Sequence, residues 1–155
     1  MLVSLGKGFA QLAVPFVACM ALVASIYHLP PRILPSIMRV EGGRPGLAHL
    51  NTDGSRDLGL MQVNTRWLPA LARYTGLPEA AVEQNLLQRS CFNIAAAGAI
   101  LRTYLDEAGG AMMPAIGFYH SHTPALGLAY QDRVVNAARA LFAPPGAKLA
   151  QGGSE

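Results

Sequence analysis

The stretch 44–63 lacks helical periodicity in a chain that is otherwise periodic, and this contrast constrains the fold most. It contains the turn cluster Asn51-Thr52-Asp53-Gly54-Ser55, flanked by short stretches that we expect to pair as a small hairpin. On both sides of it, apolar residues recur at spacings of three and four. The predicted helices cover 33–41, 65–74, 78–87, 94 to Gly109, 112–120 and 130–142. The sequence therefore predicts a mainly α (α+β) single domain of about six helices with a small β-hairpin element.

Length and composition fit one globular domain and exclude two classes of protein. The chain has 155 residues, the size of a single domain. Charged residues make up 14% and apolar residues 52%, which excludes a disordered chain. The net charge is +3, and the cations are scattered singly, without the basic run typical of nucleic-acid binders. We therefore expect no nucleic-acid partner.

The cysteines and histidines predict neither a metal site nor a cofactor site. The spacing of Cys19 and Cys91 fits no zinc motif and no disulfide framework. The histidines are dispersed along the chain, at His28, His49, His120 and His122. We therefore expect the protein to work without a metal and without a cofactor.

Residues 1–25 are predicted to be an export signal rather than part of the domain. They carry one charge, Lys7, ahead of the apolar run Phe9–Ala24. This layout is typical of a secretory signal peptide, with cleavage after Ala21 or after Ser25. The run is slightly short for a membrane span, and an uncleaved N-terminal anchor is the alternative. Both interpretations predict a periplasmic protein, either free or anchored to the inner membrane.

The other boundaries follow from this leader. The domain is predicted to cover 29–142, and a polar, glycine-rich tail to cover 143–155. If Cys19 leaves with the leader, Cys91 remains alone. In that case we expect Cys91 to be a small buried apolar side chain.

Glu41 differs from the other acids because it closes an apolar helix and precedes Gly42 and Gly43. A carboxyl at that position is expected to project over the core, with little local bulk to cover it. Burial raises a carboxyl pKa because the charged form loses hydration, and a Glu with a raised pKa can act as a general acid. The alternative is an ordinary helix-terminal Glu on a solvated turn.

Asp57 follows the turn cluster and precedes a stretch with one polar face. The alternation of Leu60, Gln62 and Asn64 with Met61 and Val63 predicts a short strand in which the two amides point the same way. Amides suit sugar hydroxyls and N-acetyl groups, because they donate and accept hydrogen bonds without charge. The alternative for Asp57 is a turn-closing residue.

The segment Asn51–Trp67 resembles the central segment shared by animal-type lysozymes and the small secretion-associated lytic transglycosylases, and Gly59-Leu60-Met61-Gln62 is the transglycosylase version of its core. Other blocks resemble the same family in the same order, over about residues 29–142. They are Ile37–Glu41, which resembles the segment of the catalytic Glu, Asn93–Leu101, Ala115–Ser121, and Tyr130 with Val134. The Asn-Thr-Asp-Gly-Ser turn together with a leader is similar to members from type IV secretion and conjugation systems.

This resemblance implies a lysozyme-like fold and cleavage of the β-1,4 bond between N-acetylmuramic acid and N-acetylglucosamine in peptidoglycan. Glu41 would protonate the leaving oxygen and then take the proton of the muramyl C6 hydroxyl, which leaves a 1,6-anhydro product. Asp57 would stabilise the positive transition state or let some turnover end in hydrolysis. The implied sugar-binding residues are Gln62, Asn64, Tyr119, His120 and Tyr130. Trp67 is expected to pack in the core.

The chain departs from the family pattern at two positions. Gly42 stands where a Ser usually follows the catalytic Glu and supports it with a hydrogen bond. His120 stands where the family usually has Asn, and an imidazole titrates near neutral pH, whereas an amide does not. His120 is expected either to face the sugar or to turn outward like His122.

Two other functions remain open at this stage. One is a hydrolytic lysozyme with the same fold and the same cut. The other is a peptidoglycan-docking component of an envelope machine whose catalysis has weakened, an interpretation that rests on Gly42 and His120. In all three, the predicted partners are peptidoglycan glycan strands and components of a type IV secretion or conjugation system.

Overall fold

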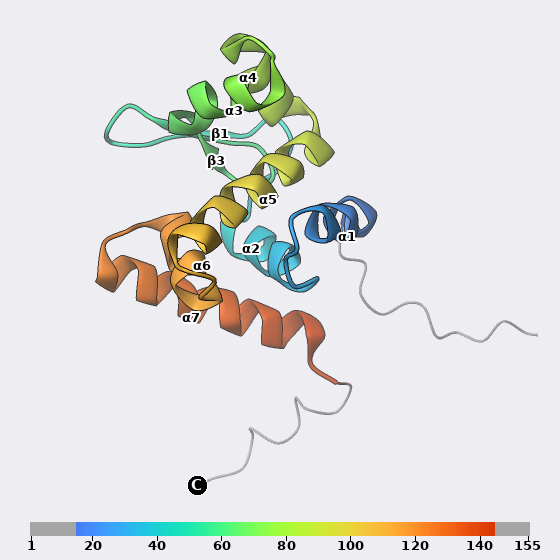
Figure 1. Ribbon diagram of the computed structural model, residues 1–155, viewed down its shortest axis with the longest axis vertical. Helices are drawn as coiled ribbons and strands as arrows, with labels where there is room; N and C mark the ends of the chain where they lie inside the picture. The colour runs from blue at the N-terminus through green and yellow to red at the C-terminus, as the bar shows by residue number, and fades with distance from the viewer. Residues whose placement is uncertain (1–14, 145–155) are drawn as a thin grey trace, which may run out of the picture.

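The computed structural model describes residues 15–144, and Figure 1 shows two groups of elements joined by one long helix. The helices of this part of the chain are α1 Val17–Ile26, α2 Ile33–Glu41, α3 Leu68–Thr75, α4 Glu79–Gln88, α5 Ser90–Glu107, α6 Met112–His120 and α7 Pro124–Phe142. The strands are β1 Ala48–Leu50, β2 Arg56–Leu58 and β3 Val63–Asn64, and the short 3-10 helix η1 Thr65–Trp67 follows them. The prediction of a mainly α fold with a small β element is confirmed, and α1 is an additional helix.

Helix α5 runs through the centre of the molecule and separates the two groups (Figure 1). The sheet, α3 and α4 lie on one side of it, and α6 and α7 lie on the other, with α2 packed against α7. Fully buried side chains from both groups meet around α5 in one core. They include Leu34, Ile37, Leu58, Met61, Ile94, Leu101 and Tyr130.

Three helix predictions can be compared directly with the structure. The predicted helices 33–41 and 112–120 are confirmed as α2 and α6. Helix α7 begins at Pro124, six residues before the predicted start at 130. Gly127 fits there because the end of α6 passes close by, so that a Cβ at Gly127 would lie 3.1 Å from the carbonyl oxygen of Ser121, which is closer than an ordinary contact. The spacing of apolar residues along the chain does not indicate this close approach of α6 and α7, so it did not predict the first turns of α7.

The irregular segment forms a three-stranded antiparallel sheet in the order β1-β2-β3, in which Asp57 lies opposite Asn64. The predicted strand, which covered Leu60 to Asn64, is too long. Only Val63 and Asn64 are extended, because the chain turns tightly before them and Gln62 adopts a left-handed backbone with φ of 50°. The side chain of Asn64 also caps the following helical turn, which begins at Thr65 as predicted, by accepting a hydrogen bond from the backbone N–H of Arg66.

Asn93, at the start of α5, fixes the sheet to the helices. Its buried side chain accepts a hydrogen bond from the backbone N–H of Met61 at 2.8 Å. It donates to the carbonyls of Leu58 at 2.8 Å and Leu86 at 2.9 Å. One amide therefore satisfies three backbone groups that an irregular loop would otherwise bury without partners.

Helix α1 packs against α5 and belongs to the folded unit. Its residues Met20, Val23 and Ala24 are buried, and a Cβ at Gly98 of α5 would collide with the side chain of Val23. The folded unit therefore starts before residue 29, where the domain was predicted to begin. Cleavage after Ala21 would divide α1, and cleavage after Ser25 would remove nearly all of it. The fate of the leader remains a prediction.

A disulfide between Cys19 and Cys91 joins α1 to α5, with a Cα–Cα distance of 5.6 Å. The predictions that the cysteines form no disulfide and that Cys91 is a lone buried side chain are therefore wrong, since Cys91 is bridged and exposed. The two cysteines are 72 residues apart in the sequence. They become neighbours only because α1 packs on α5, which their spacing could not indicate.

Two predicted segments lie partly outside the described residues. These are the leader, of which residues 1–14 are outside, and the tail, of which residues 145–155 are outside. Among the helices within 15–144, none combines the length and the apolar character needed to cross a membrane.

Candidate active site

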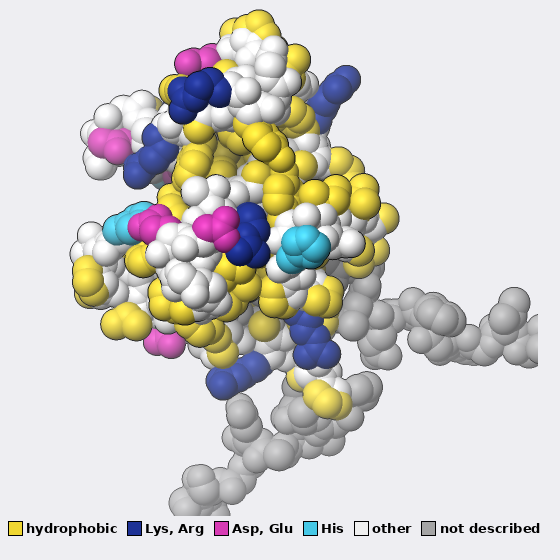
Figure 2. Space-filling model, in the orientation of Figure 1, with side chains coloured by type: hydrophobic (Ala, Val, Ile, Leu, Met, Phe, Trp, Pro, Cys, Tyr) yellow, Lys and Arg dark blue, Asp and Glu magenta, His cyan; other side chains and the backbone are white. Residues whose placement is uncertain are grey.

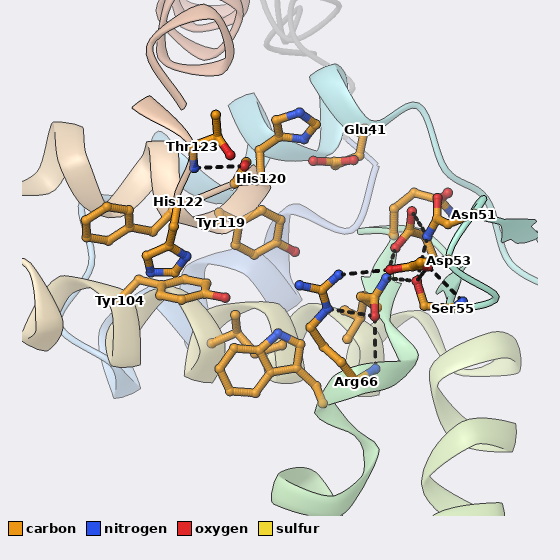
Figure 3. Close-up of a pocket in the computed structure, with 18 of the residues that line it drawn as sticks. Glu41, Asn51, Asp53, Ser55, Arg66, Tyr104, Tyr119, His120, His122 and Thr123 are labelled. Atoms are coloured by element: carbon orange, nitrogen blue, oxygen red, sulfur yellow. Dashed lines mark hydrogen bonds and ion pairs between the residues drawn. The ribbon is translucent and has the colours of Figure 1, made fainter. Parts of the chain in front are cut away.

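A cleft of about 530 Å³ opens between the sheet and helix α6, with α5 at its base (Figure 3). It is lined by Glu41 from α2, by residues of the turn cluster and the strands, by Ile100 and Tyr104 from α5, and by residues 118–123 from the end of α6 and the following turn. The two groups of the fold therefore supply opposite walls. Of the predicted site residues, Glu41, Asp57, Gln62, Asn64, Tyr119 and His120 line this cleft.

Glu41 reaches the cleft because of how α2 ends. Gly42 has a left-handed backbone with φ of 63°, and its N–H closes the helix on the carbonyl of Met38 at 3.1 Å. The next residue, Gly43, packs directly on the carbonyls of Gly59 and Leu60, with no room for a Cβ. The end of α2 is thus held against the sheet loop, and the carboxyl of Glu41 is directed into the space between them (Figure 3).

The Glu41 carboxyl is held in a setting that favours its neutral form. Burial raises its pKa from 4.5 to about 7, and the nearby negative charge of Asp57 also raises it. A hydrogen bond from Tyr130 and the charge of Arg133 act in the opposite direction. Near neutral pH, both protonation states of a carboxyl with this pKa are populated. A group that first gives and then takes a proton needs both states.

Tyr130 lies behind Glu41 rather than on the cleft wall, where it was expected. Its side chain is 1% exposed, and its hydroxyl donates a hydrogen bond of 2.5 Å to Oε1 of Glu41. Burial and the Glu41 carboxylate raise the pKa of Tyr130 far above its usual range, so the hydroxyl stays protonated and remains a donor. Tyr130 therefore orients the acid.

Tyr119 is also held by its hydroxyl. It donates a hydrogen bond of 3.0 Å to the carbonyl of Met61, which ties α6 to the turn before β3. Burial raises the pKa of Tyr119 well above its usual value. The residue lines the cleft and bridges its two walls at the same time.

Asp57 faces the cleft from β2 within a network of amides. Its carboxylate accepts hydrogen bonds from Nδ2 of Asn51 at 3.0 Å and from Nδ2 of Asn64 at 2.8 Å. The same two amides also donate to the hydroxyl of Ser55, at 3.2 and 3.0 Å. The network fixes the carboxylate while its charge acts across the cleft on Glu41.

Gln62 and Asn64 both line the cleft, but the shared strand face predicted for them does not form. Gln62 sits in the tight turn, and its Nε2 donates to the carbonyl of Gly59 at 2.8 Å. Asn64 is engaged with Asp57 and with the helical turn that follows. Only part of the hydrogen-bonding capacity of each amide remains for a ligand.

His120 lines the cleft on the same side as Glu41, and it is also exposed to solvent (Figure 3). Its ring stacks on Tyr130, with centroids 4.9 Å apart and planes at 5°. The guanidinium of Arg133 lies 5.2 Å from the centroid of the same tyrosine ring. Burial and this cation lower the pKa of His120, which favours a neutral imidazole beside the acid.

An aromatic wall of the cleft was not predicted from the sequence. His122 stacks on Phe118 with centroids 4.3 Å apart, and Tyr104 meets both rings, and that of Trp67, edge to face. Nε2 of His122 lies 2.8 Å from Oε1 of Glu107. Trp67 packs against the core as expected, and His122 is exposed as expected, but both also line the cleft. The wall draws on several separate elements, so no spacing along the chain indicates it.

Comparisons with known proteins identify relatives but no family. No protein-family model matches the chain. It is 28% identical over 106 residues to the invasion protein IagB of Salmonella typhimurium, in strains SL1344 and LT2, and of Salmonella typhi. The match covers 68% of this chain and 62% of each relative. The chain thus spans less than two thirds of the length of these relatives.

The residues at 15–144 include no cluster of three or more His, Cys, Asp or Glu side chains that could hold a metal ion. The polar groups that line the cleft include one acid with a raised pKa, the carboxylates of Asp53 and Asp57, the guanidinium of Arg66, two imidazoles, amides and phenols. Such a set can transfer a proton and stabilise a positive charge on a neutral, hydroxyl-rich ligand.

Proposed function

We propose that this protein is a peptidoglycan lytic transglycosylase that cleaves the β-1,4 bond between N-acetylmuramic acid and N-acetylglucosamine. The observation that carries the proposal is the Glu41 carboxyl, whose pKa is raised to about 7 and which faces Asp57 across an open cleft while Tyr130 holds it from behind. The resemblance of the surrounding segments to lytic transglycosylases and the similarity to IagB support the same function.

In the proposed reaction, neutral Glu41 gives its proton to the glycosidic oxygen as the bond from that oxygen to the muramyl C1 breaks. Positive charge then develops at C1, and the fixed carboxylate of Asp57 stabilises it. The Glu41 carboxylate takes the proton of the muramyl C6 hydroxyl, whose oxygen closes on C1. The product is a 1,6-anhydro sugar, no water is consumed, and Glu41 ends in its original neutral form.

We further propose that the protein is exported to the periplasm and opens the cell wall locally for a secretion or conjugation apparatus. The leader-like residues 1–25 and the Cys19–Cys91 disulfide support export, because disulfides persist in oxidising compartments. Similarity to proteins named for invasion supports a role beside an envelope machine. Cleavage at either predicted position would remove Cys19, so the disulfide accompanies the alternative in which the leader stays attached.

Hydrolysis at the same bond, as in lysozymes, is the second candidate. Asp57 favours it, because a fixed carboxylate opposite the acid can also support attack by water. The two reactions differ in product mass, since the anhydro sugar is lighter by one water.

Mass spectrometry of muropeptides released from purified sacculi tests the proposal. We expect 1,6-anhydromuramyl products from the wild-type protein. Hydrated reducing ends would assign the protein to the lysozymes instead. Sacculi that bind the protein and lose no turbidity would show that it is a docking component.

A further inference from the structure

Helix α1 is apolar on all sides, yet only one side is covered. Its sequence Val-Ala-Cys-Met-Ala-Leu-Val-Ala-Ser-Ile has no charged residue, and its inner side packs on α5. On the outer side, Val17 is 59% exposed, Leu22 62% and Ile26 57%, and the preceding Phe16 is 39% exposed. We call these four side chains the α1 surface. A helix that is apolar all round is normally buried all round, so this surface lacks a partner within the described residues.

An apolar groove extends the α1 surface. It has a volume of about 290 Å³ and is lined mainly by Val17, Ala21, Pro31, Pro35 and Phe142, where α1, the start of α2 and the end of α7 meet. In Figure 2, hydrophobic side chains gather on the side of the molecule where Figure 1 places α1. The groove shares Val17 with the α1 surface and extends it to α2 and α7 on that side.

The charged residue that lines this groove is a cation. Arg32 lies there, with its guanidinium 5.1 Å from the ring centroid of Phe142. Residues 15–40 of the sequence contain no acidic residue. An apolar face beside a cation complements a lipid surface that carries negative headgroups.

We propose that the α1 surface lies on an anionic lipid bilayer, with α1 parallel to the membrane plane. The helix has 10 residues, about 15 Å, which suits lying in the headgroup boundary. The sequence that precedes α1 is apolar from Phe9 onward apart from Gln11, a composition that fits a lipid environment.

This placement also orients the cleft. Helix α5 contacts α1 through Gly98 and lines the cleft through Ile100 and Tyr104. The cleft and the α1 surface therefore lie on different sides of α5, as Figure 1 shows for the surrounding elements. A protein held by α1 at a membrane would keep its cleft open toward the space beyond that membrane.

Co-sedimentation of the full chain with lipid vesicles tests the proposal. We expect the wild-type protein to bind vesicles of phosphatidylcholine mixed with phosphatidylglycerol, and to bind pure phosphatidylcholine more weakly. The double variant Leu22→Gln/Ile26→Gln removes two exposed apolar side chains, and we expect its partitioning to fall by about tenfold or more. The matched control is Leu126→Gln/Leu128→Gln on α7, where the side chains are 52% and 60% exposed, and we expect it to bind like the wild type.

Three outcomes would overturn the proposal. Absence of binding to either vesicle would do so directly. Equal binding of Leu22→Gln/Ile26→Gln and wild type would show that residues before α1 account for attachment. A lipid-free dimer that this variant dissociates would assign the α1 surface to a second copy. Thermal unfolding of each variant confirms that it folds, and sacculus lysis by the same variants reports separately on the proposed activity.

Discussion

The two carboxylates that face each other across the cleft differ in what surrounds them. Glu41 ends a helix over an apolar core and receives one hydrogen bond, from Tyr130, whereas Asp57 lies in a strand and receives two, from Asn51 and Asn64. Burial dominates at Glu41 and raises its pKa to about 7. The same chemical group thus becomes a proton donor on one wall and a fixed charge on the other.

Glu41→Gln should have the largest effect on this pair. The amide keeps the shape of the side chain but has no proton to transfer, so we expect sacculus lysis to fall by a factor of about 10²–10⁴. Turbidity loss of purified sacculi measures the rate. Glu79→Gln, at an exposed position in the first turn of α4, is the matched control and should lyse like the wild type. Near-wild-type lysis by Glu41→Gln would refute the assignment of the acid.

Asp57→Asn should reduce the rate less, by a factor of about 10–10², because its charge assists but transfers no proton. The new amide oxygen can still accept from one of the two neighbouring asparagines. Since the charge of Asp57 raises the pKa of Glu41, its removal should move the alkaline limb of the pH–rate profile to lower pH. A loss equal to that of Glu41→Gln would instead favour a mechanism with two essential carboxylates.

Tyr130→Phe should reduce the rate by about tenfold, the cost of one hydrogen bond that orients the acid. The bond from Tyr130 lowers the pKa of Glu41, so its loss should move the alkaline limb to higher pH, opposite to the shift for Asp57→Asn. Shifts in the same direction for both variants would show that the two groups do not act on Glu41 as described.

The same carboxyl should make stability depend on pH. Because the pKa of Glu41 is about 7 in the folded protein and 4.5 for an ordinary Glu, the folded form holds a proton that the unfolded chain has lost between these pH values. The contribution of Glu41 to the free energy of unfolding should therefore decrease as pH rises from about 4.5 to about 7. Thermal unfolding across this range should show that the wild type loses stability relative to Glu41→Gln as the pH rises.

His120→Asn should have the smallest effect. The substitution introduces the amide that is usual at this position in the lytic transglycosylases that the segment resembles, so we expect activity near that of the wild type at neutral pH. Protonation of His120 places a cation beside Glu41 and favours the ionised acid, which removes the form needed for the first step. Since the pKa of His120 is lowered, the acid limb that it causes should lie below pH 6.5, and the variant should flatten it. An unchanged profile would show that His120 has no part in the pH dependence.

Sequence reasoning succeeded where a single element carries the signal. Ile33–Glu41 and Met112–His120 follow from apolar spacing, and the acid at the end of an apolar helix followed by two glycines indicated Glu41. It failed where distant elements meet. The Cys19–Cys91 bridge and the aromatic wall around Tyr104 both depend on how separate helices pack. Gln62 is not in a strand because the chain forms a tight turn there, next to the Met61 N–H that Asn93 binds.

Glu41 and the tyrosine that holds it are 89 residues apart, and they come from the second helix and the last one. During synthesis from the N-terminus, Glu41 is therefore present in the chain long before Tyr130 is. Until α7 packs against α2, the carboxyl is hydrated and ionised at neutral pH, since neither burial nor the phenol is in place. The raised pKa of Glu41 is therefore acquired only when the last helix of the described chain has packed in place.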